Sequence, residues 1–124
     1  MKILITGATG FVGQTLIPQL QKQHSQVDIL TLNRSVRKAE IMYPSDTYPC
    51  VKHTYADDWK QVKLFNPELV VHLAAFNTSS NDSEVINSLV STNITYGILL
   101  LDALSQCESL KLFINTGSFS EFRW

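Results

Sequence analysis

Three glycines near the N-terminus constrain this chain more than any other feature. Lys2–Thr6 is a short apolar run typical of a buried strand, and apolar residues recur at helical intervals after it. Gly7, Gly10 and Gly13 therefore stand at a strand-to-helix junction. Their G-x-x-G-x-x-G spacing meets the general G-x-G-x-x-G fingerprint only in part. An ordinary glycine-rich turn is the alternative, but the flanking strand and helix favour a phosphate-binding turn.

Each glycine has its own expected role in such a turn. Gly7 can adopt a positive φ, Gly10 lacks the Cβ that would hold a pyrophosphate away from the backbone, and Gly13 lets the helix lie close to the strand. The first N–H groups of the helix and its dipole would face the phosphates. A dinucleotide is therefore the first expected ligand.

Composition narrows the remaining possibilities. The 124 residues have room for one domain, and 44% hydrophobic with 17% charged residues is ordinary for a soluble globular protein. A net charge of −1 gives no broad basic field, so nucleic acid is not an expected partner. No apolar run approaches the ~18 to 20 residues of a spanning helix, which predicts no membrane segment and a cytoplasmic protein. Cys50 and Cys107 lack metal-ligand spacing, so we expect reduced thiols and no metal site.

Strand-like and helix-like segments alternate along the chain, which predicts an α/β fold with one doubly wound parallel sheet. Strands are expected at 2–6, 27–32, 51–55, 69–73 and 111–115. Helices are expected at 11–24, 36–42, 57–64 and 83–106. Ligands of such a sheet bind at the carboxyl ends of its strands.

The segment after the second expected strand bears on the choice of cofactor. About 20 residues beyond the glycines an acidic side chain normally binds the ribose 2′-hydroxyl, and Asn33-Arg34-Ser35 holds no acid there. Arg34 can instead meet a 2′-phosphate with charge-assisted hydrogen bonds. This pattern favours NADP, with NAD as the alternative. The alternative is that Arg34 is a solvated arginine in a loop and has no role in binding.

Other polar groups follow the later strands. His72 lies within the apolar run 69–75, which favours a hydrogen-bonded core histidine over a catalytic base. Ala74 and Ala75 permit close approach of a ligand to the backbone, or simply fit a tight turn. The hydroxyls after the last strand can polarise a carbonyl of a substrate, or they can simply cap the next turn. The hydroxyls after the last strand are Thr116, Ser118 and Ser120.

Five motifs follow one another along nearly the whole chain: Thr6–Gly13, Ala56-Asp57, Val70–Ala75, Asn93–Gly97 with Leu99–Ala103, and Phe113–Ser118. In this order and spacing they resemble the extended short-chain dehydrogenase/reductases, in the nucleotide-sugar epimerase/dehydratase branch. The segment 115–119 is most similar to CDP-deoxyhexose reductases and epimerases that serve surface polysaccharide synthesis.

The resemblance implies an NAD(P)-binding Rossmann fold and roles for particular residues. Asp57 would lie by the adenine, and Asn93 would organise the active site from the long helix or simply bond local backbone. Ser118 would be the catalytic group that hydrogen-bonds the sugar carbonyl. A homodimer through the long helix is also implied. The implied cofactor-binding residues besides Asp57 and Asn93 are Gly7, Thr9, Gly10, Phe11, Val12, Gly13, Arg34, Leu73, Ala74 and Ala75.

One family motif has no counterpart in the sequence. In the family a Tyr-x-x-x-Lys pair follows the catalytic serine, where the tyrosine exchanges a proton and the lysine lowers its pKa. The chain ends at Trp124 before that position. We therefore expect residues 1–124 to be the N-terminal, cofactor-binding part of an NAD(P)-dependent nucleotide-sugar oxidoreductase or epimerase, truncated after about five strands, without the substrate-binding region and inactive alone. A non-catalytic dinucleotide-binding module and an inactive gene remnant are the alternatives.

Overall fold

The computed structural model describes residues 1–76 and 82–117. Five parallel strands form one sheet in the order β3-β2-β1-β4-β5. The expected α/β doubly wound sheet is confirmed, and every strand end lies within one residue of its expected position. The strands are β1 (Lys2–Thr6), β2 (Asp28–Asn33), β3 (Val51–Tyr55), β4 (Leu69–His72) and β5 (Leu112–Asn115).

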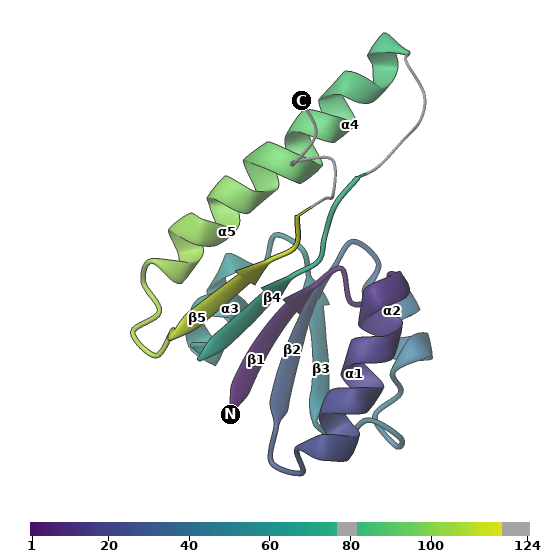
Figure 1. Ribbon diagram of the computed structural model, residues 1–124, viewed down its shortest axis with the longest axis vertical. Coiled ribbons are helices and arrows are strands. Elements are labelled where there is room, and N and C mark those ends of the chain that lie inside the picture. The colour runs from purple at the N-terminus through teal and green to yellow at the C-terminus, as the bar shows by residue number, and fades with distance from the viewer. Residues whose placement is uncertain (77–81, 118–124) are drawn as a thin grey trace.

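Helices cover both faces of the sheet (Figure 1). On one face lie α1 (Phe11–Gln23) and α2 (Val36–Met42), and on the other lie α3 (Trp59–Phe65) and a helix of 22 residues, Ser83–Leu104, which we call the long helix. In Figure 1 the early part of the long helix projects beyond the carboxyl ends of the strands. The long helix consists of η1 (Ser83–Val85), α4 (Ile86–Val90), η2 (Ser91–Thr95) and α5 (Tyr96–Leu104).

Short polar side chains begin the two short helices. Ser35 Oγ accepts the Lys38 N–H at 3.1 Å before α2, and Asp58 Oδ1 accepts the Gln61 N–H at 3.2 Å before α3. Both are N-caps that satisfy a donor of the first turn. The expected start of α3 at residue 57 is wrong by two residues, because Asp58 caps the helix and Trp59 is its first residue.

The sheet separates two hydrophobic cores. Successive residues of a strand point to opposite faces, so Ile3 and Ile5 pack toward α1, whereas Leu4 packs toward the long helix. All three side chains are fully buried. Ile17 of α1 and Leu100 of the long helix lie across from them on the two faces. This burial on both faces explains why β1 reads as a continuous apolar run in the sequence.

The long helix departs from α-helical geometry in its middle. Residues 91–95 form a π-helical turn, which accommodates an extra residue and is frequent at functional sites. The elements η1, α4 and η2 contain no buried residue, and the buried residues of the long helix are Leu100, Ala103 and Leu104. The sheet therefore supports only its last turns.

By length and composition alone the long helix could cross a membrane, because a window within it has a mean hydropathy of 1.2. The expected absence of a membrane segment concerned uninterrupted apolar runs, which this criterion does not require. The signal is weak, since core helices of globular domains pass the same test. Only 11% of the window is buried, but Leu100 and Leu104 belong to the core beneath the sheet, which favours a helix of the domain.

Candidate functional site

The strand order reverses beside β1, and a cavity lies at that point. The chain passes from β1 to β2 on one side and later returns to place β4 on the other side. A crevice outside the carboxyl ends of the strands is expected at such a switch point. The cavity there has a volume of about 740 Å³, which lies within the range of about 300 to 1,000 Å³ typical of ligand sites. Its walls are the turn after β1, the segments after β2, β3 and β4, and one side of the long helix.

Gly7 makes the turn after β1 possible. Its φ is +70°, the left-handed region that favours glycine. A Cβ at this position would lie 2.7 Å from Ala74 N and 2.7 Å from the carbonyl carbon of Leu73. The turn therefore passes directly against the segment after β4, and both segments line the cavity.

Gly10 and Gly13 begin α1 in different ways. A Cβ on Gly10 would meet only Gly7 O, at 3.2 Å, so the space beyond it is open toward the cavity. A Cβ on Gly13 would lie 2.3 Å from Ala8 O, so this glycine allows the helix to approach the turn itself. The first intrahelical bond runs from Gln14 N to Gly10 O. The N–H groups of residues 11–13 precede it and form the positive end of the helix dipole.

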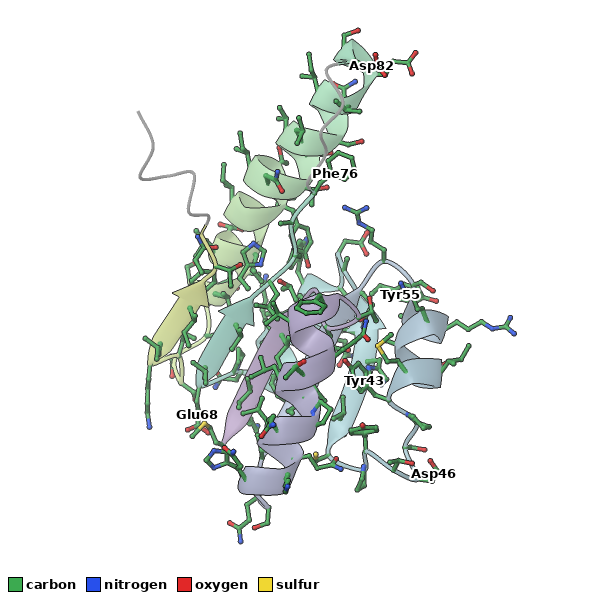
Figure 2. All side chains as sticks on the ribbon, turned by 45° about the vertical axis from the view of Figure 1, so that its right-hand side comes forward. Tyr43, Asp46, Tyr55, Glu68, Phe76 and Asp82 are labelled. Atoms are coloured by element: carbon green, nitrogen blue, oxygen red, sulfur yellow. The ribbon has the colours of Figure 1, made fainter. Side chains whose placement is uncertain are left out.

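Tyr43 holds the glycine turn from within the hydrophobic core. This residue, labelled in Figure 2, caps the end of α2, and its buried hydroxyl donates to Ala8 O at 2.6 Å. Burial is the main cause that raises the Tyr43 pKa to about 12, so the phenol stays a donor. The same Ala8 carbonyl contacts α1 beside Gly13. The turn is therefore fixed from both sides.

His72 is a structural residue rather than a free base. Thr6 Oγ1 accepts the N–H groups of Leu73 and Ala74, both at 3.1 Å. Its own hydrogen must then point to His72 Nδ1, which lies at 2.6 Å, so Nδ1 is the acceptor of a neutral imidazole. Burial lowers the pKa of His72. This arrangement agrees with the expected hydrogen-bonded core histidine.

Acid should weaken the fold through His72. The folded pKa lies below the unfolded value of 6.5, so the neutral ring stabilises the fold above about pH 6.5, and this contribution is lost as the pH falls through the folded pKa. We expect the melting temperature to fall between about pH 7.5 and about pH 5. His72→Asn keeps an acceptor for Thr6 without a titrating ring, so its melting temperature should depend less on pH in circular dichroism. The exposed control His24→Asn should retain the full dependence, and an unchanged dependence in His72→Asn would contradict this account.

Basic side chains occupy one end of the cavity. Arg34, directly after β2, and Lys38, on the first turn of α2, both line it together with Ser35. The amide nitrogen of the neighbouring Asn33 is not a free donor, because it donates to Thr31 and to Thr54 O inside the sheet. Among the described residues that line the cavity there is no carboxylate. This end therefore suits an anion.

The opposite wall is the long helix, which side-chain hydrogen bonds tie to the strand ends. Asn93 accepts the Phe76 N–H at 2.8 Å and donates to Phe76 O at 2.9 Å. Phe76 lies on the segment that leads from β4 toward the helix (Figure 2). Tyr96 Oη donates to Ala56 O at 2.8 Å, and burial raises the Tyr96 pKa, so this phenol also remains a donor. Arg34 Nη2 donates to Thr92 Oγ1 at 2.7 Å.

The residues predicted to bind a cofactor are placed in three ways. Phe11 and Val12 are exposed on the first turn of α1 and, like Gly13, are not among the residues that line the cavity. Their backbone N–H groups belong to the positive end of the helix. Asp57 is exposed beside Ala56, while Asn93 bonds Phe76, and neither Asp57 nor Asn93 lines the cavity. Ser118 lies outside the described residues. The predicted residues that line the cavity are Gly7, Thr9, Gly10, Arg34, Leu73, Ala74 and Ala75.

Sequence reasoning missed most of the long-helix wall. Ser88, Thr92 and Tyr96 are four residues apart and share one side of the helix, and they line the cavity with Ser91. The recurrence of polar residues at intervals of four was the available signal, but the prediction used only the apolar residues of this helix. The other lining residues that were not predicted to bind a cofactor are Ala8, Leu32, Asn33, Ser35, Lys38, Ala56 and Phe76.

The parallel doubly wound sheet, the glycine turn and the switch-point cavity define a Rossmann-fold domain. The sequence profile of the NAD dependent epimerase/dehydratase family matches residues 3–122. The chain belongs to this family, which confirms the resemblance to the extended short-chain dehydrogenase/reductases.

Individual relatives agree with this assignment. The CDP-abequose synthase of Yersinia pseudotuberculosis is 27% identical over 122 residues, which are 98% of this chain and 41% of that protein. A UDP-glucose-4-epimerase of Stenotrophomonas maltophila, solved with NAD and formylated UDP-arabinopyranose, aligns with a TM-score of 0.78 at 17% identity. Gre2 of Candida albicans, solved with NADPH, also gives 0.78, at 18% identity. Each alignment to these two structures covers 97% of this chain and 38% of the other. The chain thus spans about two fifths of the length of these relatives.

Proposed function

We propose that the chain binds a nicotinamide dinucleotide in the switch-point cavity and prefers NADP to NAD. The main support for the proposal is that one cavity is lined both by the glycine turn and by basic side chains. The glycine turn and the start of α1 offer N–H groups to a pyrophosphate, and Arg34 and Lys38 offer positive charge at the other end. Structures of the same fold hold NAD in one case and NADPH in another, which supports the class of cofactor without deciding between the two.

The preference for NADP follows from the groups after β2. An NAD site at this position uses a carboxylate to accept hydrogen bonds from the ribose 2′-hydroxyl. No carboxylate is present among the described lining residues, and the amide nitrogen of Asn33 already donates inside the sheet. Arg34, Ser35 and Lys38 are instead donors, which suit a 2′-phosphate.

The chain should bind NADPH more tightly than NADH when nicotinamide fluorescence is titrated. Arg34→Gln should lower the affinity for NADPH about tenfold, because it removes one charge-assisted contact worth about 1.4 kcal/mol, and should leave NADH unaffected. Arg37→Gln is the matched control, since Arg37 is an exposed arginine of α2 that does not line the cavity. Equal affinities of Arg34→Gln and the unsubstituted chain for NADPH would reject the assigned preference.

We further propose that this domain serves a longer cytoplasmic enzyme that reduces or epimerises the 4-keto group of a nucleotide-linked deoxysugar for surface polysaccharide. The similarity to CDP-abequose synthase over 98% of the chain supports this substrate class. Bound nicotinamide would supply the hydride chemistry, and Ser118 would hydrogen-bond the sugar carbonyl. Reading the coding DNA beyond Trp124 in all three frames tests the proposal, because a catalytic enzyme of this family requires Tyr-x-x-x-Lys there, and its absence from every frame would refute it.

We also propose a homodimer through the long helix. An exposed apolar face repeats along it at intervals of three or four residues, as on a helix that packs against another helix. Sedimentation should show a dimer, and Ile98→Glu should shift it to a monomer. A monomer at all concentrations would reject this assembly. The exposed apolar residues are Ile86, Val90, Ile94, Ile98 and Leu101.

A further inference from the structure

The hydrogen bond between Arg34 and Thr92 joins the two walls of the cavity. Arg34 Nη2 donates to Thr92 Oγ1 at 2.7 Å across 58 positions of sequence. Both residues line the cavity, Arg34 from the end of β2 and Thr92 from the π-helical turn. Among the described residues the one ion pair joins Lys111 to Glu68, so no described carboxylate pairs with the Arg34 guanidinium. Among the described residues, the hydroxyl of Thr92 is the side-chain hydrogen-bond partner of Arg34.

The position of the Thr92 hydroxyl is itself fixed by its neighbours. Asn93, the next residue, bonds both backbone groups of Phe76. Tyr96, four residues on and on the same side of the helix, donates to Ala56 O. These bonds hold the π-helical turn against the segments after β3 and β4. A hydroxyl on this turn consequently has a defined place above the end of β2.

An anchored guanidinium retains capacity for a phosphate. Arginine carries five N–H donors in a rigid fork. The contact with Thr92 uses a donor of Nη2 and leaves others to meet an anion from a fixed direction, close to Ser35 and Lys38. A free arginine would lose side-chain entropy when it bound the phosphate, whereas an anchored one has lost much of it beforehand.

We propose that Thr92 is a positioning residue that holds Arg34 ready for the 2′-phosphate and so sets the discrimination between NADPH and NADH. The inference rests on the proposed function, since it requires that the cavity bind these nucleotides. It assigns a cofactor-specificity role to a residue of the long helix that is not part of the glycine turn after β1.

The test compares isosteric changes on one turn of helix. Thr92→Val removes the hydroxyl and keeps the shape of the side chain. It should lower the affinity for NADPH about fivefold and leave the affinity for NADH unchanged. Thr92→Ser restores the hydroxyl and should bind both nucleotides as the unsubstituted chain does. Thr95→Val is the matched control, because Thr95 is exposed on the same turn and does not line the cavity. Fluorescence titration of the 124-residue chain gives all the affinities.

The outcomes separate this inference from the function on which it rests. If Arg34→Gln lowers the affinity for NADPH but Thr92→Val does not, the positioning role of Thr92 is wrong and the cofactor preference stands. Equal weakening of both nucleotides by Thr92→Val would mean a merely structural role and would also overturn it. In an Arg34→Gln background Thr92→Val should have no further effect, and a full additive loss there would contradict the inference. Binding of neither nucleotide by the unsubstituted chain would reject both proposals.

Discussion

Gly7→Ala is expected to lower the free energy of unfolding by about 3 kcal/mol or more. Two penalties act together at this position. The φ of +70° is unfavourable for alanine, and the new Cβ would lie 2.7 Å from Ala74 N, where only a shift of the backbone can relieve the overlap. Denaturation in urea, followed by circular dichroism, measures the change directly.

Gly97→Ala is the matched control for that experiment. Gly97 lies in α5 at ordinary helical φ, and a Cβ there would have its nearest neighbour, His72 Nε2, at 3.9 Å. The same added methyl group should therefore stabilise the chain by about 0.5 to 1 kcal/mol through helix propensity. Similar effects of the two substitutions on the urea midpoint would show that the turn tolerates a side chain, contrary to its geometry.

Gly10→Val should abolish most nucleotide binding while the fold persists. Gly10 has an extended backbone with φ −78°, which valine can adopt, and its Cβ would meet only Gly7 O at 3.2 Å. The added methyl groups would then occupy the open space where the pyrophosphate is proposed to lie. We expect the affinity for NADPH and NADH alike to fall on the order of a hundredfold, or about 2.7 kcal/mol.

The control for Gly10→Val is Thr15→Val, which places the same side chain on the exposed surface of α1 away from the cavity. It should leave affinity and melting temperature unchanged. Gly10→Val should itself melt cooperatively, within about 1 kcal/mol of the unsubstituted chain. If Gly10→Val retained full affinity in a folded state, the pyrophosphate could not lie at this turn.

The fold was predictable from the sequence because its signals are local. The apolar run of β1 and the glycines after it need no distant contact to be recognised, and β2, β4 and β5 carry similar runs, whereas the edge strand β3 is more polar. The strand order then follows from right-handed crossovers. The start of α3 was misplaced by two residues because two aspartates compete to cap it, and only the contact of Asp58 with Gln61 N decides between them.

The site was predictable only where it follows a strand. Arg34 and the segment after β4 were identified because parallel strands bring their carboxyl ends together. Thr92 was not, because its place depends on a π-helical turn that Asn93 fixes by bonds to Phe76, a contact between residues 17 positions apart. The periodicity of the sequence predicts a regular helix. It therefore gave no reason to expect contacts between the Thr92 side of the long helix and the strand ends.

The cavity has walls of two different kinds, because the long helix projects beyond the sheet. One wall is continuous with the hydrogen-bonded strand ends. In the other wall η1, α4 and η2 bury no residue, and side-chain hydrogen bonds join η2 to Arg34 and Phe76. A dinucleotide that touched both walls would act as a strut between them. Binding of the ligand would then raise the free energy of local unfolding of α4, so hydrogen exchange in α4 would slow as the site is filled. The ligand would thus stabilise the wall that recognises it.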